Sequence, residues 1–466
     1  MRNYVLLPFN FITISNHEVL INELGDFIIT PIGTARSIVD HTIPDGELYK
    51  SLVANFYITE EVFPSLLDIY ASRLRTKKGF LDDKTSLHIF VLTLRCNQNC
   101  TYCQASSQEE LSRHCSMSIE DMTASVQMMF LSPSPHLTME FQGGEPSLEI
   151  DLIRHGIETA EEINKVENRK LTYVLCTNCR TLSDELLELC KQHSIMISTS
   201  LDGPSYIHNN NRGREDSYEK TISGINKARC ALGNDAVSAL MTTSELALDY
   251  PKEIVDEYVK DGFNGIFLRA LNPYGLAAQN DDWKKYNQRF VDFYKKALDY
   301  IIELNMQGLF FREEYASVIL RKMLTPYTTG FVDLQSPAGT INSVIVYNYD
   351  GYVYASDESR MLAEVRDFSF RLGKVTDRYE EVFCGSVAKK MGKVWANEAL
   401  AGCSSCPIKA YCGADPVRHH STQGDMYGFR PTSMVCEKNK AIIKHLLSLI
   451  VERGEEVLPI FRRWVK

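Results

Sequence analysis

The chain has 466 residues, of which 44% are hydrophobic and 24% charged, and its formal net charge is -10. This length predicts two or three domains, and the composition is that of an ordinary soluble globular protein. The acidic balance argues against nucleic acid as the main partner, because proteins that bind it usually carry a clustered positive surface. No apolar run approaches the roughly 18 to 20 residues that span a bilayer, and the N-terminus lacks a signal-peptide cleavage site. We therefore expect a cytoplasmic protein with no membrane partner and no nucleic-acid partner.

Residues 1–85 predict a small winged-helix-like module. Short apolar runs separated by turn residues indicate strands, and three helical patterns come after them. The expected strands are Val5–Pro8, Val19–Ile21 and Phe27–Ile29, and the expected helices are Thr34–His41, Asp45–Asn55 and Pro64–Thr76.

Residues 86–305 alternate between apolar strand patterns and amphipathic helix patterns. The expected strands are His88–Leu94, Leu137–Phe141, Leu171–Cys176, Ile195–Leu201, Ala236–Thr242 and Gly265–Arg269. The expected helices are Ser118–Leu131, Glu149–Val166, Ser183–Gln192, Ser217–Leu232 and Pro251–Asp261, with Ser118 as an N-cap. Six such units in series predict parallel strands with right-handed crossovers. Since six is two short of a closed eight-stranded barrel, we expect an α/β fold built on an open, partial (β/α)6 barrel, with its active site at the C-terminal ends of the strands.

Residues 306–466 break this alternation. Turns, a compact group of cysteines and a final helix near Glu437–Arg453 predict a C-terminal cysteine-rich cluster domain.

Thirteen cysteines carry much of the functional information. A reducing cytosol disfavours disulfides, and the odd count and tight spacing favour metal ligation. Cys96, Cys100 and Cys103 directly follow the first barrel strand, so one loop can wrap an inorganic cluster with three thiolates. A [4Fe–4S] cubane held in this way keeps one iron open, where a small molecule can chelate and receive an electron. The alternatives are a zinc loop, which usually needs a fourth ligand that is not nearby, or buried structural cysteines.

The Cys-x3-Cys-x2-Cys spacing, with Tyr102 before the last cysteine, resembles the signature of the radical S-adenosylmethionine (SAM) superfamily. The resemblance implies a partial βα barrel whose [4Fe–4S] cluster reductively cleaves SAM to a 5′-deoxyadenosyl radical. Gly143, Gly144 and Glu145 follow the second strand and resemble the family's Gly-Gly-Glu-Pro segment, which contacts the amino group of the cofactor. Glycine lets the backbone approach closely, and Glu145 could accept a hydrogen bond from an ammonium.

Later segments fit the same family pattern. Ser200 and Asp202 follow the fourth strand and resemble its Ser-x-Asp-Gly segment, which implies that Ser200 faces the carboxylate or the ribose of SAM. Arg212 stands where related enzymes often place an arginine for the cofactor carboxylate. Cys176 and Cys179 form another Cys-x2-Cys at the end of the third strand, interpreted as one core thiol and one incidental thiol, with a metal site as the alternative. The remaining upstream cysteines are interpreted as packing residues: Cys115, Cys190 and Cys230.

A second set of cysteines lies near the C-terminus: Cys403, Cys406, Cys412 and Cys436. By spacing alone, structural zinc and a second [4Fe–4S] cluster are equally compatible with four ligands. The set resembles the SPASM extension of radical SAM enzymes that modify peptides, which carries two auxiliary clusters. Ser356 and Pro416 stand where that extension expects cysteines of one of its clusters. The resemblance therefore implies a single auxiliary [4Fe–4S] cluster in this chain.

Asp357, next to Ser356, matches a position where sulfatase-maturing relatives place a catalytic carboxylate. Because Glu358 stands beside it, a solvated acidic turn is the alternative interpretation.

The order of strands and helices in residues 1–85 resembles a peptide-recognition element that adds a substrate leader to its sheet edge, although a structural appendage is equally compatible. The segments Leu6–Phe11, Ser356–Arg360 and Tyr411–Val417 resemble the maturase of the His-Xaa-Ser peptide system. This resemblance implies an enzyme that modifies a ribosomally made peptide or protein with a leader, using an external electron donor. The alternatives are an anaerobic sulfatase-type maturase that forms formylglycine, and a non-catalytic peptide-binding protein that holds a cluster or zinc.

Overall fold

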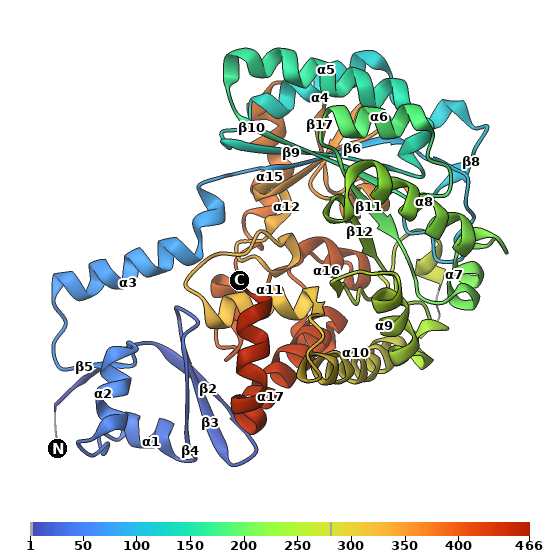
Figure 1. The fold of residues 1–466 in the computed structure, drawn as a ribbon. Helices are drawn as coiled ribbons and strands as arrows, with labels where there is room; N and C mark the ends of the chain where they lie inside the picture. The colour runs from blue at the N-terminus through green and yellow to red at the C-terminus, as the bar shows by residue number, and fades with distance from the viewer. Residues whose placement is uncertain (1–2, 280–281) are drawn as a thin grey trace.

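The computed structural model describes residues 3–279 and 282–466. The N-terminal module lies to one side of the rest of the chain, at the lower left of Figure 1. The elements of this module are β1 (Val5–Leu6), β2 (Phe9–Ile14), β3 (His17–Asn22), β4 (Phe27–Pro31), α1 (Thr34–Val39), α2 (Glu47–Ala54), β5 (Ile58–Thr59) and α3 (Pro64–Lys77). Strands β2, β3 and β4 form an antiparallel sheet, and β1 pairs with β5. Leu20, Ile38 and Leu52 are fully buried in a core of the module's own. The three predicted strands and three predicted helices are present, but β2 and β5 are additional strands, and β5 interrupts the predicted order because it lies between α2 and α3.

The central sheet contains the predicted parallel strands. They are β6 (Leu87–Thr93), β9 (His136–Gly143), β10 (Lys170–Thr177), β11 (Met196–Ser200) and β12 (Val237–Leu240). Each pairs in parallel with the next, in the order β6, β9, β10, β11, β12. The sixth strand is shorter than predicted: β13 (Gly265–Ile266) pairs with β14 (Arg312–Glu313), and only an isolated bridge from Thr243 to Ala270 joins this part of the chain to the end of β12. The barrel is therefore open, which confirms the predicted partial barrel.

The C-terminal part of the chain extends the same sheet. Its strands are β15 (Val344–Tyr347), β16 (Tyr352–Tyr354) and β17 (Arg371–Lys374). Strand β15 pairs in parallel with β6, and β16 and β17 continue as antiparallel neighbours. The sheet thus has eight strands, and the boundary predicted near residue 305 falls between regions that share one sheet.

Helices cover the sheet and close its ends. Those of the barrel are α4 (Ile119–Phe130), α5 (Ile150–Glu167), α6 (Asp184–Gln192), α7 (Ser205–Arg212), α8 (Ser217–Leu232), α9 (Pro251–Lys260) and α10 (Trp283–Met306). Those of the C-terminal part include α11 (Glu314–Leu324), α13 (Asp357–Ala363), α16 (Pro416–Gln423) and α17 (Met434–Trp464). The hydroxyl of Ser118 accepts a hydrogen bond from the Asp121 N–H at 3.0 Å, which confirms the predicted N-cap. Helix α17 begins and ends beyond the predicted 437–453, with a kink at Arg453.

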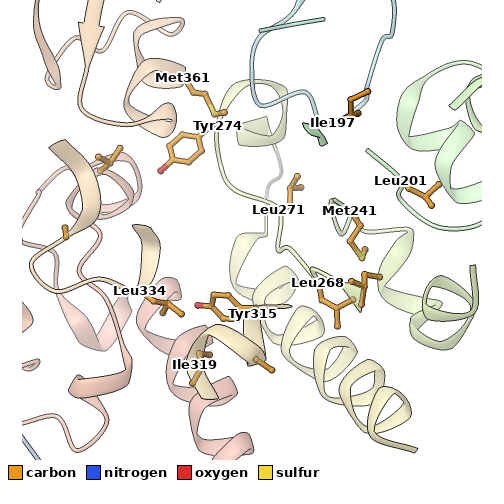
Figure 2. Packing of buried hydrophobic residues seen from close by; sticks show 14 of the residues in the cluster. Ile197, Leu201, Met241, Leu268, Leu271, Tyr274, Tyr315, Ile319, Leu334 and Met361 are labelled. Atoms are coloured by element: carbon orange, nitrogen blue, oxygen red, sulfur yellow. The ribbon is translucent and has the colours of Figure 1, made fainter. Parts of the chain in front are cut away.

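One hydrophobic core joins the barrel to the C-terminal part. Figure 2 shows Ile197 and Met241 from the barrel facing the same interior as Tyr315 and Leu334 from the C-terminal part. Because these side chains pack together, the two regions position one another across the interior of the barrel. Among the described helices, none has the length and apolar character needed to cross a bilayer.

Candidate active site

The first three cysteines lie on the loop that leaves the C-terminal end of β6. Cys96, Cys100 and Cys103 line a cavity of about 240 Å³ at the C-terminal ends of the barrel strands. The backbone N–H of Gln98 donates to Cys96 Sγ at 3.4 Å, and that of Ser107 donates to Cys103 Sγ at 3.4 Å. Donors of this kind stabilise thiolates, which are the form that ligates iron.

Close backbone contacts fix the shape of this cysteine loop. The N–H groups of Asn99 and Thr101 donate to carbonyls at the C-terminal end of α7, at 3.3 and 2.9 Å. A Cβ added to Gly213, whose φ is +69°, would lie 2.2 Å from Asn99 O, and one added to Gly275 would lie 2.4 Å from Cys103 O. Only glycine allows both approaches, so the loop is held from two sides.

Three thiols that line one cavity form a donor set that an iron–sulfur cluster can use. Across residues 3–279 and 282–466, no three His, Cys, Asp or Glu side chains converge closely enough to hold one metal ion. Ligands of a zinc ion lie only about 2.3 Å from it and must converge, whereas those of the larger cubane surround a cavity. Burial raises the pKa of the Cys96 thiol to about 12, so this site favours thiolates only when a positive group is bound there.

The Gly-Gly-Glu segment joins the ends of two strands. A Cβ on Gly143 would lie 2.2 Å from Thr93 O at the end of β6, and one on Gly144 would lie 2.4 Å from Arg95 O just after it. Both glycines line the cavity. Glu145 is buried, and its carboxylate accepts from Thr177 Oγ1 at 2.6 Å and from the Asn178 N–H at 2.8 Å. Glu145 therefore ties the end of β9 to the end of β10, and its contact with a cofactor ammonium stays a prediction.

A buried ion pair supports the opposite wall. Arg212 donates through Nε and Nη2 to the two carboxylate oxygens of Asp202, both at 2.9 Å, and Tyr102 donates to the same carboxylate at 2.6 Å. Arg212 also lies 3.8 Å from Cys100 Sγ and, like Tyr102 and Ser200, lines the cavity. Despite burial, the Arg212 guanidinium and neighbouring hydrogen bonds hold the pKa of Asp202 below its usual range. Asp202 thus orients Arg212 and Tyr102 from behind the cavity wall.

A second cavity of about 470 Å³ continues into the barrel. It shares five lining residues with the cysteine cavity: Gln142, Cys176, Ser198, Leu240 and Arg269. Aromatic side chains, including Phe267, Phe331 and Tyr315, line its far side. The two cavities therefore adjoin one another at these five residues.

Asp357 and Glu358 occupy the first turn of α13, and each faces a different cavity. Asp357 lines the cysteine cavity and pairs with Arg360 at 3.2 Å, whereas Glu358 lines the second cavity with Arg269 at 4.0 Å. Burial, with Asp333 and Asp357 nearby, raises the pKa of Glu358 to about 7. The alternative of a solvated acidic turn is therefore wrong.

Sequence reasoning missed several residues of the second cavity. Cys176, interpreted as a core or incidental thiol, faces both cavities, while Cys230 is exposed and does not pack in the core. Glu140 stands on β9, where only the register reveals its inward direction, and Arg269 lies in the irregular segment after β13. The usable signal for Cys176 was its place at the C-terminal end of a predicted strand.

The second set of cysteines gathers between the segment 400–412 and the start of α17. Burial raises the pKa of the Cys412 thiol, and the nearby Cys436 and Cys406 thiols add to the rise. Burial also raises the pKa of the Cys436 thiol, and the nearby Cys403 and Cys406 thiols add to that rise. The thiols thus influence one another electrostatically, and their joint ligation of a cluster stays a prediction.

The positions without cysteine have structural roles instead. Ser356 caps α13 by accepting from the Ser359 N–H at 3.3 Å. Pro416 begins α16, where a missing N–H costs nothing, and Asp415 caps that helix.

Comparison with known families identifies the barrel. The profile of the Radical SAM superfamily matches residues 90–244, which include β6 to β12 and the first three cysteines. The chain contains a radical SAM domain. It is 23% identical over 332 residues to the cysteine-type anaerobic sulfatase-maturating enzyme of Clostridium novyi, an alignment that covers 68% of this chain and 83% of the relative.

The similarity to solved structures extends beyond the residues that this family profile matches. The structure of anSMEcpe with bound AdoMet is 17% identical, with a TM-score of 0.65, and the match covers 81% of this chain and 98% of the other. Streptococcus suis SuiB bound to its precursor peptide SuiA is 13% identical, with a TM-score of 0.53 over 93% of this chain and 100% of SuiB. At these identities the structures establish a shared fold.

Proposed function

We propose that this radical SAM enzyme is a maturase of the His-Xaa-Ser type, which modifies a ribosomally made peptide or protein that carries a leader. The observation that carries the proposal is the continuity of the two cavities. The first places three thiols beside Arg212 and Ser200, and the second offers about 470 Å³ to a substrate residue. When bound at the three thiols, the [4Fe–4S] cluster and SAM supply a 5′-deoxyadenosyl radical that removes a hydrogen atom from the substrate.

The chain's own residues bind and orient the cofactor and exclude water from the site. Arg212 offers a guanidinium to the cofactor carboxylate, and Asp202 fixes its direction with two hydrogen bonds. Gly143 and Gly144 leave room along the cofactor, and Ser200 offers a hydroxyl on the facing strand. The aromatic wall of the second cavity excludes water from the substrate carbon.

Two carboxyl groups are candidates for taking a substrate proton. The sequence motif favours Asp357, but its oxygen is already paired with the buried Arg360. Glu358 has only the more distant Arg269 and a pKa of about 7, so it can accept a proton near neutral pH. Replacing each by its amide separates the two: loss of peptide product with retained 5′-deoxyadenosine formation identifies the proton acceptor.

The N-terminal module supports a peptide as substrate. Strand β4 is an edge strand, while β2 at the other edge lies beside α17, with Ser15 donating to Glu452 at 2.6 Å (Figure 1). The β4 edge can therefore add a leader strand. Helix α3 of the same module has no buried residue, and Phe63, which precedes it, and Leu67 are exposed apolar side chains that a peptide could contact. SuiB, of similar fold, was captured with its precursor peptide.

We further propose that Cys403, Cys406, Cys412 and Cys436 hold one auxiliary [4Fe–4S] cluster. Anaerobic reconstitution tests this together with the first cluster: about eight irons per chain are expected, and about four after replacing Cys96, Cys100 and Cys103 by alanine. SAM and dithionite should yield 5′-deoxyadenosine with the wild type only. Zinc in place of iron, with no 5′-deoxyadenosine, would instead support a non-catalytic binding protein.

Substrate identity needs a separate experiment. Any short open reading frame found next to the gene is to be co-expressed with the enzyme, and the product examined by mass spectrometry. A modified peptide supports the maturase proposal, whereas conversion of a sulfatase Cys or Ser to formylglycine would support the sulfatase-type alternative.

A further inference from the structure

Each set of cysteines has one arginine beside it, and the two arginines differ in their charge balance. Arg212 Nη1 lies 3.8 Å from Cys100 Sγ, and its guanidinium is neutralised by Asp202 through two hydrogen bonds. Arg430 Nε donates directly to Cys403 Sγ at 2.9 Å. No carboxylate of the described chain forms an ion pair with Arg430, whose remaining hydrogen bonds go to the carbonyls of Tyr427 and Gly428 and to the ring of His419.

Arg430 is held in place by its surroundings. Its exposed fraction is 9%. A Cβ at Gly402, whose φ is +74°, would lie 3.3 Å from its Cγ, so the cysteine segment packs closely on its stem. The guanidinium donates to Tyr427 O at 2.8 Å, which fixes its plane. A cation buried this far with no carboxylate is costly unless an anion is bound beside it.

Two further donors face the other side of the same site. Asn439 Nδ2 points to Cys412 Sγ at 3.6 Å, and Tyr315 fixes the orientation of this amide by donating to its oxygen at 2.9 Å. Lys322 Nζ donates to Cys412 O at 3.1 Å and to Leu334 O, and it has no ion-pair partner among the described carboxylates. Two of the four thiols, Cys403 and Cys412, thus accept from side-chain donors, and the donor at Cys403 is a guanidinium without a bonded carboxylate.

We propose that Arg430 raises the reduction potential of the auxiliary cluster above that of the Cys96–Cys100–Cys103 cluster. This inference rests on the proposed function, because it requires iron at the second set of cysteines. The reason is electrostatic: reduction adds a negative charge to the cluster, and an unneutralised guanidinium bonded to a ligand sulfur stabilises the reduced form more than the oxidised form. The neutralised Arg212 has a smaller effect on the first cluster.

The test is an anaerobic redox titration of the reconstituted full-length enzyme, followed by electron paramagnetic resonance. In the wild type the auxiliary cluster should be reduced at the higher potential. Arg430→Met should lower its potential so that the reduced-to-oxidised ratio at a fixed potential falls at least tenfold, or about 59 mV for one electron. The potential of the auxiliary cluster in Arg430→Gln should lie between those of the wild type and Arg430→Met. The first cluster in the same sample is the internal reference and should not move.

Lys409 provides the matched control. It lies between Cys406 and Cys412, but its charge is paired with Glu23 at 2.8 Å. Lys409→Met should therefore shift the potential of the auxiliary cluster much less than Arg430→Met. An equal shift in both variants, or no shift in an Arg430 variant that retains about eight irons, overturns the proposal.

Loss of iron from the auxiliary site is a separate outcome, which metal analysis detects. If all replacements of Arg430, including Arg430→Lys, lose the auxiliary irons, Arg430 is needed to form the site and its role in setting the potential is overturned. A wild type that holds only about four irons, or zinc at the second set, contradicts the proposed auxiliary cluster itself and is recognised by metal analysis before any titration.

Discussion

Arg212 and Asp202 form a buried two-bond ion pair directly behind the first set of cysteines, with both donor–acceptor distances at 2.9 Å. Neither residue is adjacent in sequence to the cysteines, yet Arg212 reaches their cavity and Asp202 orients it. The pair joins the end of β11 to the end of α7 and so couples the barrel to the cysteine loop.

Breaking this pair should be costly. Asp202→Asn leaves the Arg212 guanidinium buried without a counter-charge, and removal of one partner of a buried pair costs about 3–5 kcal/mol. Urea denaturation measures this cost, and equilibrium dialysis should show weaker SAM binding. Glu185→Gln breaks the exposed pair of Glu185 with Arg154 (2.7 Å) and should cost about 0–1 kcal/mol. Equal costs for the two variants would contradict the role given to Asp202.

Gly213 should be required for the cysteine loop. Gly213→Ala places a Cβ 2.2 Å from Asn99 O, so the loop must move and the first cluster should be lost. Gly424 has a similar φ of +72° with nothing within 4 Å of an added Cβ, so Gly424→Ala should cost only the strain of about 1 kcal/mol. Iron content after reconstitution distinguishes them: about four irons are lost in the first variant and none in the second.

Restoring a cysteine at position 356 should not create another cluster. Ser356→Cys replaces a helix cap while Pro416 still begins α16, so the iron content should stay at about eight per chain. Loss of the cap should cost about 1 kcal/mol in thermal or urea unfolding. An increase to about twelve irons would show that the missing thiol alone had prevented a second auxiliary cluster.

Glu313 should make stability depend on pH. Burial raises the pKa of this carboxyl from 4.5 to about 7, although Tyr294 and backbone N–H groups donate to it. The folded state therefore binds the proton more tightly than the unfolded state, so this contribution is present below about pH 4.5 and is lost as the pH rises through about 7. The stability difference between wild type and Glu313→Gln should change by up to about 3 kcal/mol across this window. A difference that is independent of pH would contradict the raised pKa.

Tyr411 should anchor the N-terminal module to the segment of the second cysteine set. Its hydroxyl, fully buried, donates to Gly25 O at 2.8 Å, so Tyr411→Phe leaves a buried carbonyl without this donor, at a cost of about 1–3 kcal/mol. Hydrogen exchange of the backbone around residues 22–26 should become faster, while exchange in α4 should not. Unchanged exchange around Gly25 would show that Lys409–Glu23 and the packing there suffice.

The sequence determined the elements whose signals are local. Alternating strands and helices predicted the open barrel, and the spacing of Cys96, Cys100 and Cys103 after the first strand predicted the site that the cavity now surrounds. Ser118 could be assigned as a cap because its partner is only three residues away. Such features depend on neighbours along the chain, and the sequence shows these directly.

Only the tertiary structure decided which distant residues meet. The addition of β15 to the edge of β6, the two cavities shared through Cys176 and Arg269, and the bond from Arg430 to Cys403 all depend on register and packing across long separations. The sequence also left open whether Asp357 and Glu358 form a solvated turn, because burial is a property of what packs around a residue. The sequence therefore determined which cysteines can ligate a cluster, and the fold decided which side chains surround them.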